Sequence, residues 1–159
     1  MVSIVDVRRH PGSKSFPQFN KENMAKELLA NDISYAHIEK LGGRRKETAK
    51  ASGAYDNSGW QNKSFRSYAD YMVTTSFKEG IQELLLHIEK CKGYLAVMCS
   101  EAVPWRCHRR LISDYLVMVD GISVYNIIGN SGHPYRHKIT SFALHLDDND
   151  DGIIYYPKS

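Results

Sequence analysis

Short apolar segments of strand length alternate in this chain with segments of helical periodicity, and this alternation constrains the fold most. The first three predicted strands are Ser3 to Val7, Ile33 to Ile38 and Tyr94 to Met98. Predicted helices lie between them: Asn20 is the expected N-cap residue of one, and the other begins near Ser76. Strand–helix–strand units give a mostly parallel sheet flanked by helices. The predicted fold class is α/β, with a Rossmann-like three-layer arrangement in one domain over residues 1–159.

The later part of the chain predicts further elements of the same kind. They are a short helix over Ser64 to Tyr71, a helix from Pro104 to about Asp120, and strands at Ile122 to Ile128 and Ile153 to Tyr156. The continuous apolar run Tyr94 to Met98 is typical of a strand buried on both faces of a parallel sheet. Residues 46–63 are polar and rich in Gly, Ser and Asn, which favours a long loop that acts as a lid or binding surface.

The composition is that of a soluble globular domain. The 159 residues are 42% hydrophobic and 25% charged, so the chain can bury a core without a disulfide or metal. The three cysteines are an odd number, and the sequence shows no positively charged leader before an apolar run, so we expect free thiols and a cytoplasmic location. No apolar stretch reaches the length of a membrane span. We expect no membrane association, no cofactor and no metal.

Positive charge is concentrated in the first two thirds of the chain. Residues 1–110 carry eighteen Lys or Arg against twelve Asp or Glu, whereas residues 111–159 carry three against six. The two regions therefore have net charges of +6 and −3, within a total of +3. Such asymmetry suggests an anionic partner, a phosphate-containing small molecule or nucleic acid, although a solvated basic face gives the same pattern.

The segment from Met98 to Arg110 carries the densest chemistry. It places Cys99 and Glu101 after a strand and His108 near a helix start, with Arg106 and Arg109 between and beside them. A helix N-terminus and arginines attract anions and lower the pKa of a nearby thiol, which makes Cys99 a candidate nucleophile. Glu101 and His108 are then candidates for acid–base catalysis. A buried, inert Cys99 fits the same pattern.

Two analogies for this segment are imperfect. Cys99 and Arg106 form a C-x6-R arrangement, one residue longer than the C-x5-R loop of phosphatase and rhodanese-like enzymes. The order of Cys99, Glu101, Cys107 and His108 resembles that of zinc deaminases, but the spacing is too short and no C-x-x-C pair is present. We therefore expect Cys107 to be packed in the core, and Cys91 to be structural.

The first two strands also end in polar residues. Asp6, Arg8 and Arg9 follow the first strand, with Asp6 and Arg8 on one side of it. His37, Gly43 and Arg44 lie at the end of the second. Because the carboxyl ends of parallel strands meet at one edge of a sheet, we expect these residues to line one anion-binding cleft with the Cys99 segment. For several of them a structural role is equally compatible with the sequence: Asp6 can cap a loop, and His37 can be a bonded core histidine.

Aromatic residues surround a further cation. Trp60, Phe65, Tyr68 and Tyr71 are interleaved with Arg66 and can stack bases beside a phosphate. At helical spacing the tyrosines can equally be core residues. These two alternatives predict opposite exposures for the rings.

The ordered motifs of the chain resemble one protein family. They are Asp6-Val7-Arg8-Arg9-His10-Pro11, Tyr35-x-His37 with Leu41-Gly42-Gly43-Arg44, Phe65-Arg66-x-Tyr68, and Met98-Cys99-x-Glu101 with Cys107-His108-Arg109-Arg110. Together they are similar to the domain-of-unknown-function family numbered 488. The resemblance implies a small cytoplasmic α/β protein of bacteria or archaea and no settled activity. Members usually carry an earlier strand and helix, with a Gly-x-Ser-like turn, before the Asp-Val-Arg motif.

Three functions remain open on these residues. The first is an enzyme acting on a phosphate-containing or nucleic-acid substrate, in which arginines bind the anion and Cys99 or Glu101 does the chemistry. The second is a module that binds a nucleotide or nucleic acid without turnover. The third is a thiol-dependent enzyme, similar to a phosphatase or sulfurtransferase, that uses Cys99.

Overall fold

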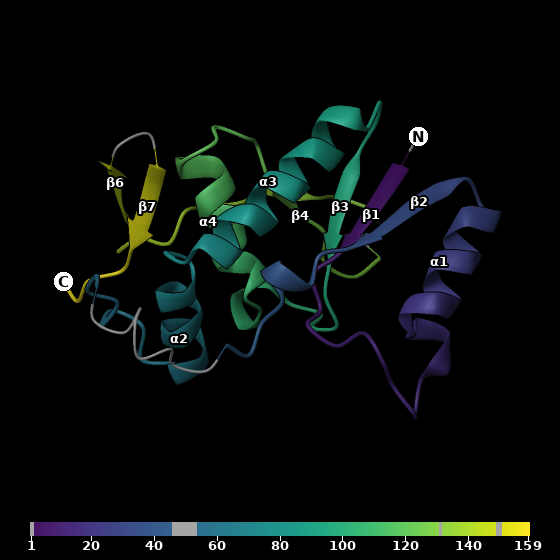
Figure 1. Cartoon of the computed structure of the whole chain (residues 1–159), viewed down its shortest axis with the longest axis horizontal. Coiled ribbons are helices and arrows are strands. Elements are labelled where there is room, and N and C mark those ends of the chain that lie inside the picture. Colours follow the sequence, from purple (N-terminus) through teal and green to yellow (C-terminus); the bar gives the residue numbers. More distant parts are fainter. Residues whose placement is uncertain (1, 46–53, 131, 149–150) are drawn as a thin grey trace. The chain divides into compact units, whose positions relative to one another are not determined.

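A computed structural model describes residues 2–45, 54–130, 132–148 and 151–159, and the chain forms two compact units (Figure 1). The first unit comprises Met1–Gly43 and Ser76–Ser100, and the second comprises Arg44–Thr75 and Glu101–Ser159. The predicted α/β class is confirmed: the first unit has a parallel sheet with helices, and the second combines helices with small antiparallel sheets. The organisation of residues 1–159 as a single domain stays a prediction.

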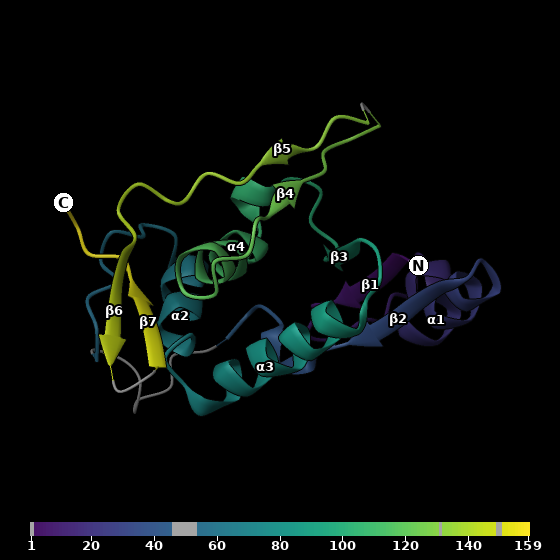
Figure 2. The ribbon, with the colours of Figure 1, turned by 90° about the horizontal axis from the view of Figure 1, so that it is seen from above.

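The first unit is built on a three-stranded parallel sheet. Its strand order is β2 (Ile33–His37), β1 (Val2–Asp6), β3 (Leu95–Met98). The helix α1 (Lys21–Ala30) connects β1 to β2, and α3 (Thr75–Lys90) precedes β3. Figure 2 shows these two helices on opposite faces of the sheet. The predicted strand–helix–strand order of this region is confirmed.

The strand register aligns the ends of all three strands. Asp6, the last residue of β1, is paired with His37 of β2 and with Met98 of β3. The backbone N–H of Val7 donates to Met98 O at 2.9 Å, and that of Ile38 donates to Asp6 O at 3.0 Å. The segments that follow the three strands therefore begin at the same edge of the sheet.

The core of the first unit lies around β1 and the inner side of α3. Val5, Val7, Phe77 and Leu84 are fully buried, each stabilising the fold by roughly 1.5–3 kcal/mol relative to an exposed side chain. Residues of η2 (Glu39–Leu41) complete this core through buried Leu41.

The prediction that the third strand is buried on both faces was wrong. Residues of β3 are only half-buried, and Tyr94 is 87% exposed and precedes the strand. Among the described residues β3 pairs with β1 alone, so it is an edge strand. The continuous apolar run Tyr94 to Met98 therefore belongs to a half-buried edge strand and not to a central strand of the sheet.

The second unit contains two helices and two short antiparallel sheets. The helices are α2 (Lys63–Tyr71) and α4 (Arg109–Met118), and a 3-10 turn, η3 (Pro104–Arg106), precedes α4. One sheet pairs β4 (Tyr125–Asn126) with β5 (Tyr135–Arg136), and the other pairs β6 (Leu144–Asp148) with β7 (Asp151–Tyr155). The side chain of Asn62 caps α2 by accepting from the backbone N–H of Ser64 at 2.9 Å.

Aromatic residues form the core of the second unit. The Trp60 ring packs edge-on against Phe65 at 5.1 Å and Phe142 at 4.9 Å, and lies 5.2 Å from Tyr156. Trp60, Phe65, Tyr68 and Tyr71 are all buried. The alternative in which these rings are core residues is therefore confirmed, and the base-stacking surface predicted from them was wrong.

Three predicted elements of this unit differ from the observed ones. The helix expected from Pro104 is a 3-10 turn followed by extended backbone at Cys107, with φ −122° and ψ 143°, so α4 begins five residues later. Within the expected strand Ile122 to Ile128, only the two residues of β4 form a strand. The last strand, expected over Ile153 to Tyr156, is β7. Both β4 and β7 pair in antiparallel sheets. Of the predicted 46–63 loop, residues 46–53 lie outside the described part of the chain.

Candidate functional site

A buried ion pair closes the end of β1. Asp6 is fully buried, and Arg8 follows it two residues later with 11% of its side chain exposed. The Arg8 guanidinium donates from Nη2 to Asp6 Oδ2 at 2.7 Å and from Nε to Oδ1 at 2.9 Å. The Asp6 carboxylate also accepts the backbone N–H of Arg8 at 3.0 Å and the hydroxyl of Tyr35 at 2.5 Å. The prediction that Asp6 and Arg8 share one side of the strand is confirmed.

The network changes the acidity of all three groups. Burial opposes ionisation of Asp6, but the hydrogen bonds from Arg8 and Tyr35 outweigh it and hold the pKa of Asp6 below its ordinary value. The hydrogen bond to Asp6 raises the pKa of Arg8. Burial, together with the Asp6 charge, raises the pKa of Tyr35 well above the ordinary phenol value. Asp6 is therefore an ionised positioning group and not a general base.

His37 fixes the segment that follows β1. Its Nε2 lies 2.6 Å from the backbone oxygen of Arg8, so this nitrogen carries a proton and donates to the carbonyl. Two hydrogen bonds thus fix the start of this loop. The His37 side chain of β2 donates to Arg8 O, and the Val7 N–H donates to the backbone oxygen of Met98 in β3. Both alternatives raised by the sequence, a loop-binding Asp6 and a bonded His37, match the observed contacts.

Arg9 and the glycines after η2 are packed together. A Cβ atom added to Gly42 would lie 2.6 Å from Arg9 Cα, so only glycine fits at position 42. Arg9 also forms an ion pair with Glu39, with Nε 3.5 Å from Oε1, and both side chains are partly exposed. Gly43 is half-buried and follows this contact. Gly42 is therefore required for the close contact with Arg9. The sequence predicted that a ligand could approach the backbone at the two glycines, and this stays a prediction for Gly43.

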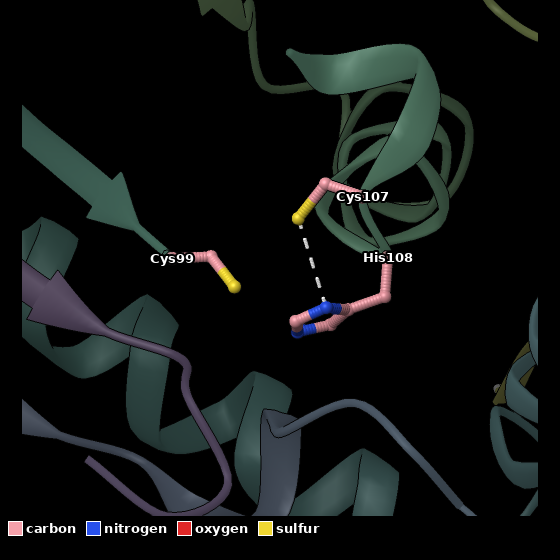
Figure 3. Close-up of side chains that lie close together, drawn as sticks. All are labelled: Cys99, Cys107 and His108. Carbon is pink, nitrogen blue, oxygen red and sulfur yellow. Dashed lines mark hydrogen bonds between the residues drawn. The ribbon is translucent and has the colours of Figure 1, made fainter. Parts of the chain in front are cut away.

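Cys99 directly follows β3 and is half-buried (Figure 3). It comes one residue after Met98, which is paired with Asp6. The first unit therefore carries an Asp6–Arg8–His37 cluster and the Cys99 thiol on segments that leave the same edge of one sheet.

A second cluster lies at the start of α4. Cys107 is only 3% exposed, and its Sγ accepts from the backbone N–H and the Nε of Arg109, at 3.4 and 3.2 Å. His108 Nδ1 lies 3.7 Å from the same sulfur, and Figure 3 shows the two side chains turned toward each other. Cys107 is buried as expected, and its sulfur packs among N–H donors. Cys and His are also residue types that ligate transition metals.

Glu101 and Arg109 have structural partners in the second unit. Arg109 Nη2 donates to the backbone oxygen of Glu101, and Glu101 Oε1 accepts from the N–H of Ala102 at 3.0 Å. The ring of His108 packs against Tyr68 at 5.0 Å. Glu101, His108 and Arg109 are thus gathered around the segment before α4.

The remaining predicted cations are dispersed. Arg66 donates from Nε and Nη2 to the backbone oxygen of Trp60, at 3.0 and 2.8 Å, and so closes the turn before α2. Arg44 is exposed and has a left-handed backbone with φ 56°. Arg106 is exposed in η3. Arg66 therefore has a structural partner, whereas anion binding by Arg44 and Arg106 stays a prediction.

Asp114, for which the sequence pattern predicts no role, organises the second unit. This fully buried carboxylate accepts from His137 Nε2 at 2.8 Å, from the hydroxyl of Tyr156 at 2.9 Å and from the N–H of Thr140 at 3.1 Å. An Asp within an otherwise apolar helical face is a signal that could have marked it. Its three partners come from the last 25 residues, which sequence spacing does not connect to it.

The profile of the family described as Domain of unknown function DUF488 matches residues 1–116. The chain belongs to this family. The DUF488 match contains both clusters, from Asp6 to Arg109, and confirms the resemblance drawn from the motifs. No curated protein and no solved structure is significantly similar to the chain. Among the described residues, no helix is both long and apolar enough to cross a membrane.

Proposed function

We propose that the carboxyl edge of the parallel sheet in the first unit binds an anionic, phosphate-containing ligand, and that Arg8 contacts it. The observation that carries this proposal is the hydrogen-bonded Asp6–Arg8 pair at the end of β1. Ligands of open α/β sheets bind beyond the carboxyl ends of the strands, where strand order reverses. In the order β2-β1-β3 the reversal falls between β1 and β3. As part of the same proposal, the α/β fold has a Rossmann-like three-layer arrangement.

The Asp6 carboxylate supports this role by fixing the Arg8 guanidinium. The Asp6 carboxylate accepts hydrogen bonds from Nε and Nη2 of Arg8 and not from Nη1. The N–H groups of Nη1, fixed in the same planar guanidinium, can therefore donate to another anion. Arg9 follows directly and places a second guanidinium next to the pair, itself ion-paired with Glu39. A preoriented guanidinium loses little side-chain entropy on binding, which favours a small ligand such as a phosphate monoester.

Whether the bound ligand reacts depends on the Cys99 thiol, which follows β3 at the same edge of the sheet. In the catalytic form of the proposal, the Cys99 thiolate attacks the phosphorus of a phosphate monoester held by Arg8, the bond to the leaving alcohol breaks, and water then hydrolyses the cysteinyl phosphate to phosphate. In a sulfurtransferase-like variant the thiolate instead takes the outer sulfur of a sulfane-sulfur donor, whose remaining part leaves as an anion. The acid–base roles of Glu101 and His108 stay predictions from the sequence. In the alternative form, the edge binds a nucleotide or nucleic acid without turnover. The cytoplasmic location expected from the sequence fits either form and stays a prediction.

Titration with inorganic phosphate tests the binding step. Isothermal titration of the full chain is expected to show saturable binding that Arg8→Gln weakens at least tenfold and that Arg8→Lys restores only in part, because Lys lacks the planar fork. Lys158→Gln, which removes an exposed cation of the second unit, is the control and should bind phosphate like the wild type. Wild-type protein without saturable binding, or equal affinities for Arg8→Gln and wild type, would refute the proposal.

A further inference from the structure

The β4–β5 hairpin and its described flanks, residues 121–130 and 132–140, form an arm that differs in charge from the sequence around it. The sequence from 121 to 140 contains no Asp or Glu and includes Arg136 and Lys138, whereas all six acidic residues of 111–159 lie outside it. The arm also lies beyond the DUF488 match over residues 1–116. Its chemistry therefore calls for an explanation separate from the site at the parallel sheet.

The inner side of the arm is anchored to α4. His137 donates from Nε2 to the buried carboxylate of Asp114 at 2.8 Å, and its Nδ1 lies 3.4 Å from Nδ2 of Asn126. The backbone N–H of His137 donates to Val124 O at 2.8 Å. A two-stranded sheet is marginal by itself, so these contacts fix the position of the arm within the second unit (Figure 2).

The opposite face of the arm carries an aromatic ring beside cations. Tyr125 is paired with Arg136 across the two strands, and residues directly opposite one another share a face. Because consecutive strand residues alternate, this face is the one turned away from Asn126. Tyr125 is 56% exposed and Ile127 is 68% exposed, and the Arg136 and Lys138 side chains are exposed as well. We call Tyr125 and Arg136, together with their exposed neighbours Ile127 and Lys138 just beyond the strand ends, the outer face of the arm.

We propose that the outer face of the arm binds single-stranded nucleic acid. Any base offers a flat partner for the exposed Tyr125 ring, and Arg136 and Lys138 provide charges for the flanking phosphates. Within residues 121–140 no carboxylate opposes this charge. An acidic peptide would satisfy the two cations but would leave the Tyr125 ring without a stacking partner. Two cations are too few for tight binding to a duplex, whose recognition depends on many phosphate contacts.

Fluorescence anisotropy of a labelled oligothymidylate of about 12 nucleotides, a length within the usual site sizes, tests this proposal with the full chain. At about 50 mM salt the wild type is expected to bind saturably, with affinity falling as salt rises. Tyr125→Ala should weaken binding about tenfold, and Tyr125→Phe should retain it because the ring remains. Arg136→Gln should reduce the slope of log affinity against log salt by about 0.7.

Controls separate this surface from other sites. Tyr94→Ala removes a tyrosine of the first unit that is even more exposed than Tyr125, and this variant should bind the oligonucleotide like the wild type. Lys26→Gln removes an exposed cation of the first unit and should also bind the oligonucleotide normally. Tyr125→Ala should bind inorganic phosphate like the wild type, so failure of the arm and failure of the phosphate site are distinguishable. The proposal is overturned if the wild type does not bind the oligonucleotide, or if Tyr125→Ala binds as well as Tyr125→Phe. Displacement by polyglutamate with no effect of Tyr125→Ala would assign the face to an acidic peptide instead.

Discussion

Tyr35 and Asp6 lie on neighbouring strands, and the Tyr35 hydroxyl donates to the same carboxylate oxygen, Oδ2, that accepts from Arg8 Nη2. The two donors hold Asp6 ionised although it is fully buried. Asp6→Asn would leave the Arg8 guanidinium without its counter-charge in a site that is nearly closed to water. We expect a loss of about 3–5 kcal/mol in the free energy of unfolding, measured by urea denaturation. Asp32→Asn, an exposed carboxylate at φ 59° where Asn is well tolerated, should change it by less than about 0.5 kcal/mol.

The stability of the protein should fall on acidification because of the same carboxylate. The pKa of Asp6 is lower in the folded state than in the unfolded chain, so its contribution is fully present above the unfolded value of about 3.9. It is lost as pH falls through the lower, folded pKa. Urea midpoints of wild type and Asp6→Asn should therefore converge below about pH 4. A stability difference that stays constant down to acid unfolding would contradict the assignment of the charge to Asp6.

Raised tyrosine pKa values predict a loss of stability at alkaline pH. Burial, with the nearby charges of Asp120 and Asp151, raises the pKa of Tyr115 to about 12. The unfolded phenol ionises near 10, so stability is unaffected below this pH and falls as pH rises from about 10 through 12. Tyr115→Phe should flatten this part of the profile. Far-UV circular dichroism against pH follows this profile, and an equally steep loss in Tyr115→Phe and wild type would contradict the assignment.

Two glycines test the packing between η2 and the loop after β1. A Cβ at position 42 would lie 2.6 Å from Arg9 Cα, which is backbone and cannot move without displacing the Asp6–Arg8 segment. Gly42→Ala should cost about 1–3 kcal/mol, seen as a lower melting temperature. An added Cβ at Gly12 would meet nothing within 4 Å, and Gly12→Ala should be neutral or slightly stabilising. Equal melting temperatures for the two variants would show that the close approach is not present in solution.

Local sequence signals predicted the first unit well because its elements are specified by short-range patterns. The strand after residue 32 and the helix after Asn20 each have a clear period and a clear end, and both appear at the expected positions. Asn20 is not the side-chain cap that the sequence suggested: its Oδ1 accepts from Ser13 N–H and organises the preceding loop. A local motif thus marked the helix start correctly although the hydrogen bond serves another segment.

The second unit was harder to predict because its elements are fixed by contacts distant in sequence. Asp114 connects α4 to Tyr156, and Tyr156 N–H in turn donates to Asn57 Oδ1 at 2.9 Å. Nothing in the spacing of these residues indicates that they meet. Similarly, Ile122 to Ile128 has the composition of a buried strand, but Gly121 and Gly129 have positive φ values of 64° and 58°, and only two residues between them pair in β4. The strand pattern correctly placed Asp6, His37 and Cys99 at the ends of parallel strands, whereas their roles in a site stay predictions.

The reactivity of the three thiols distinguishes the catalytic form of the proposed function from the binding form. Cys107 is 3% exposed, so iodoacetamide should label it slowest in the folded chain even though Arg109 donates to its sulfur. A nucleophilic Cys99 should be alkylated at pH 7 faster than Cys91, which is also half-buried and whose Sγ contacts Tyr94 O at 3.6 Å. Peptide mapping by mass spectrometry after timed labelling gives the three rates. Labelling of Cys99 that lags both other cysteines would remove the nucleophile and leave the phosphate-binding proposal, and Cys99→Ser should then keep phosphate affinity within about twofold while lowering stability by roughly 1 kcal/mol.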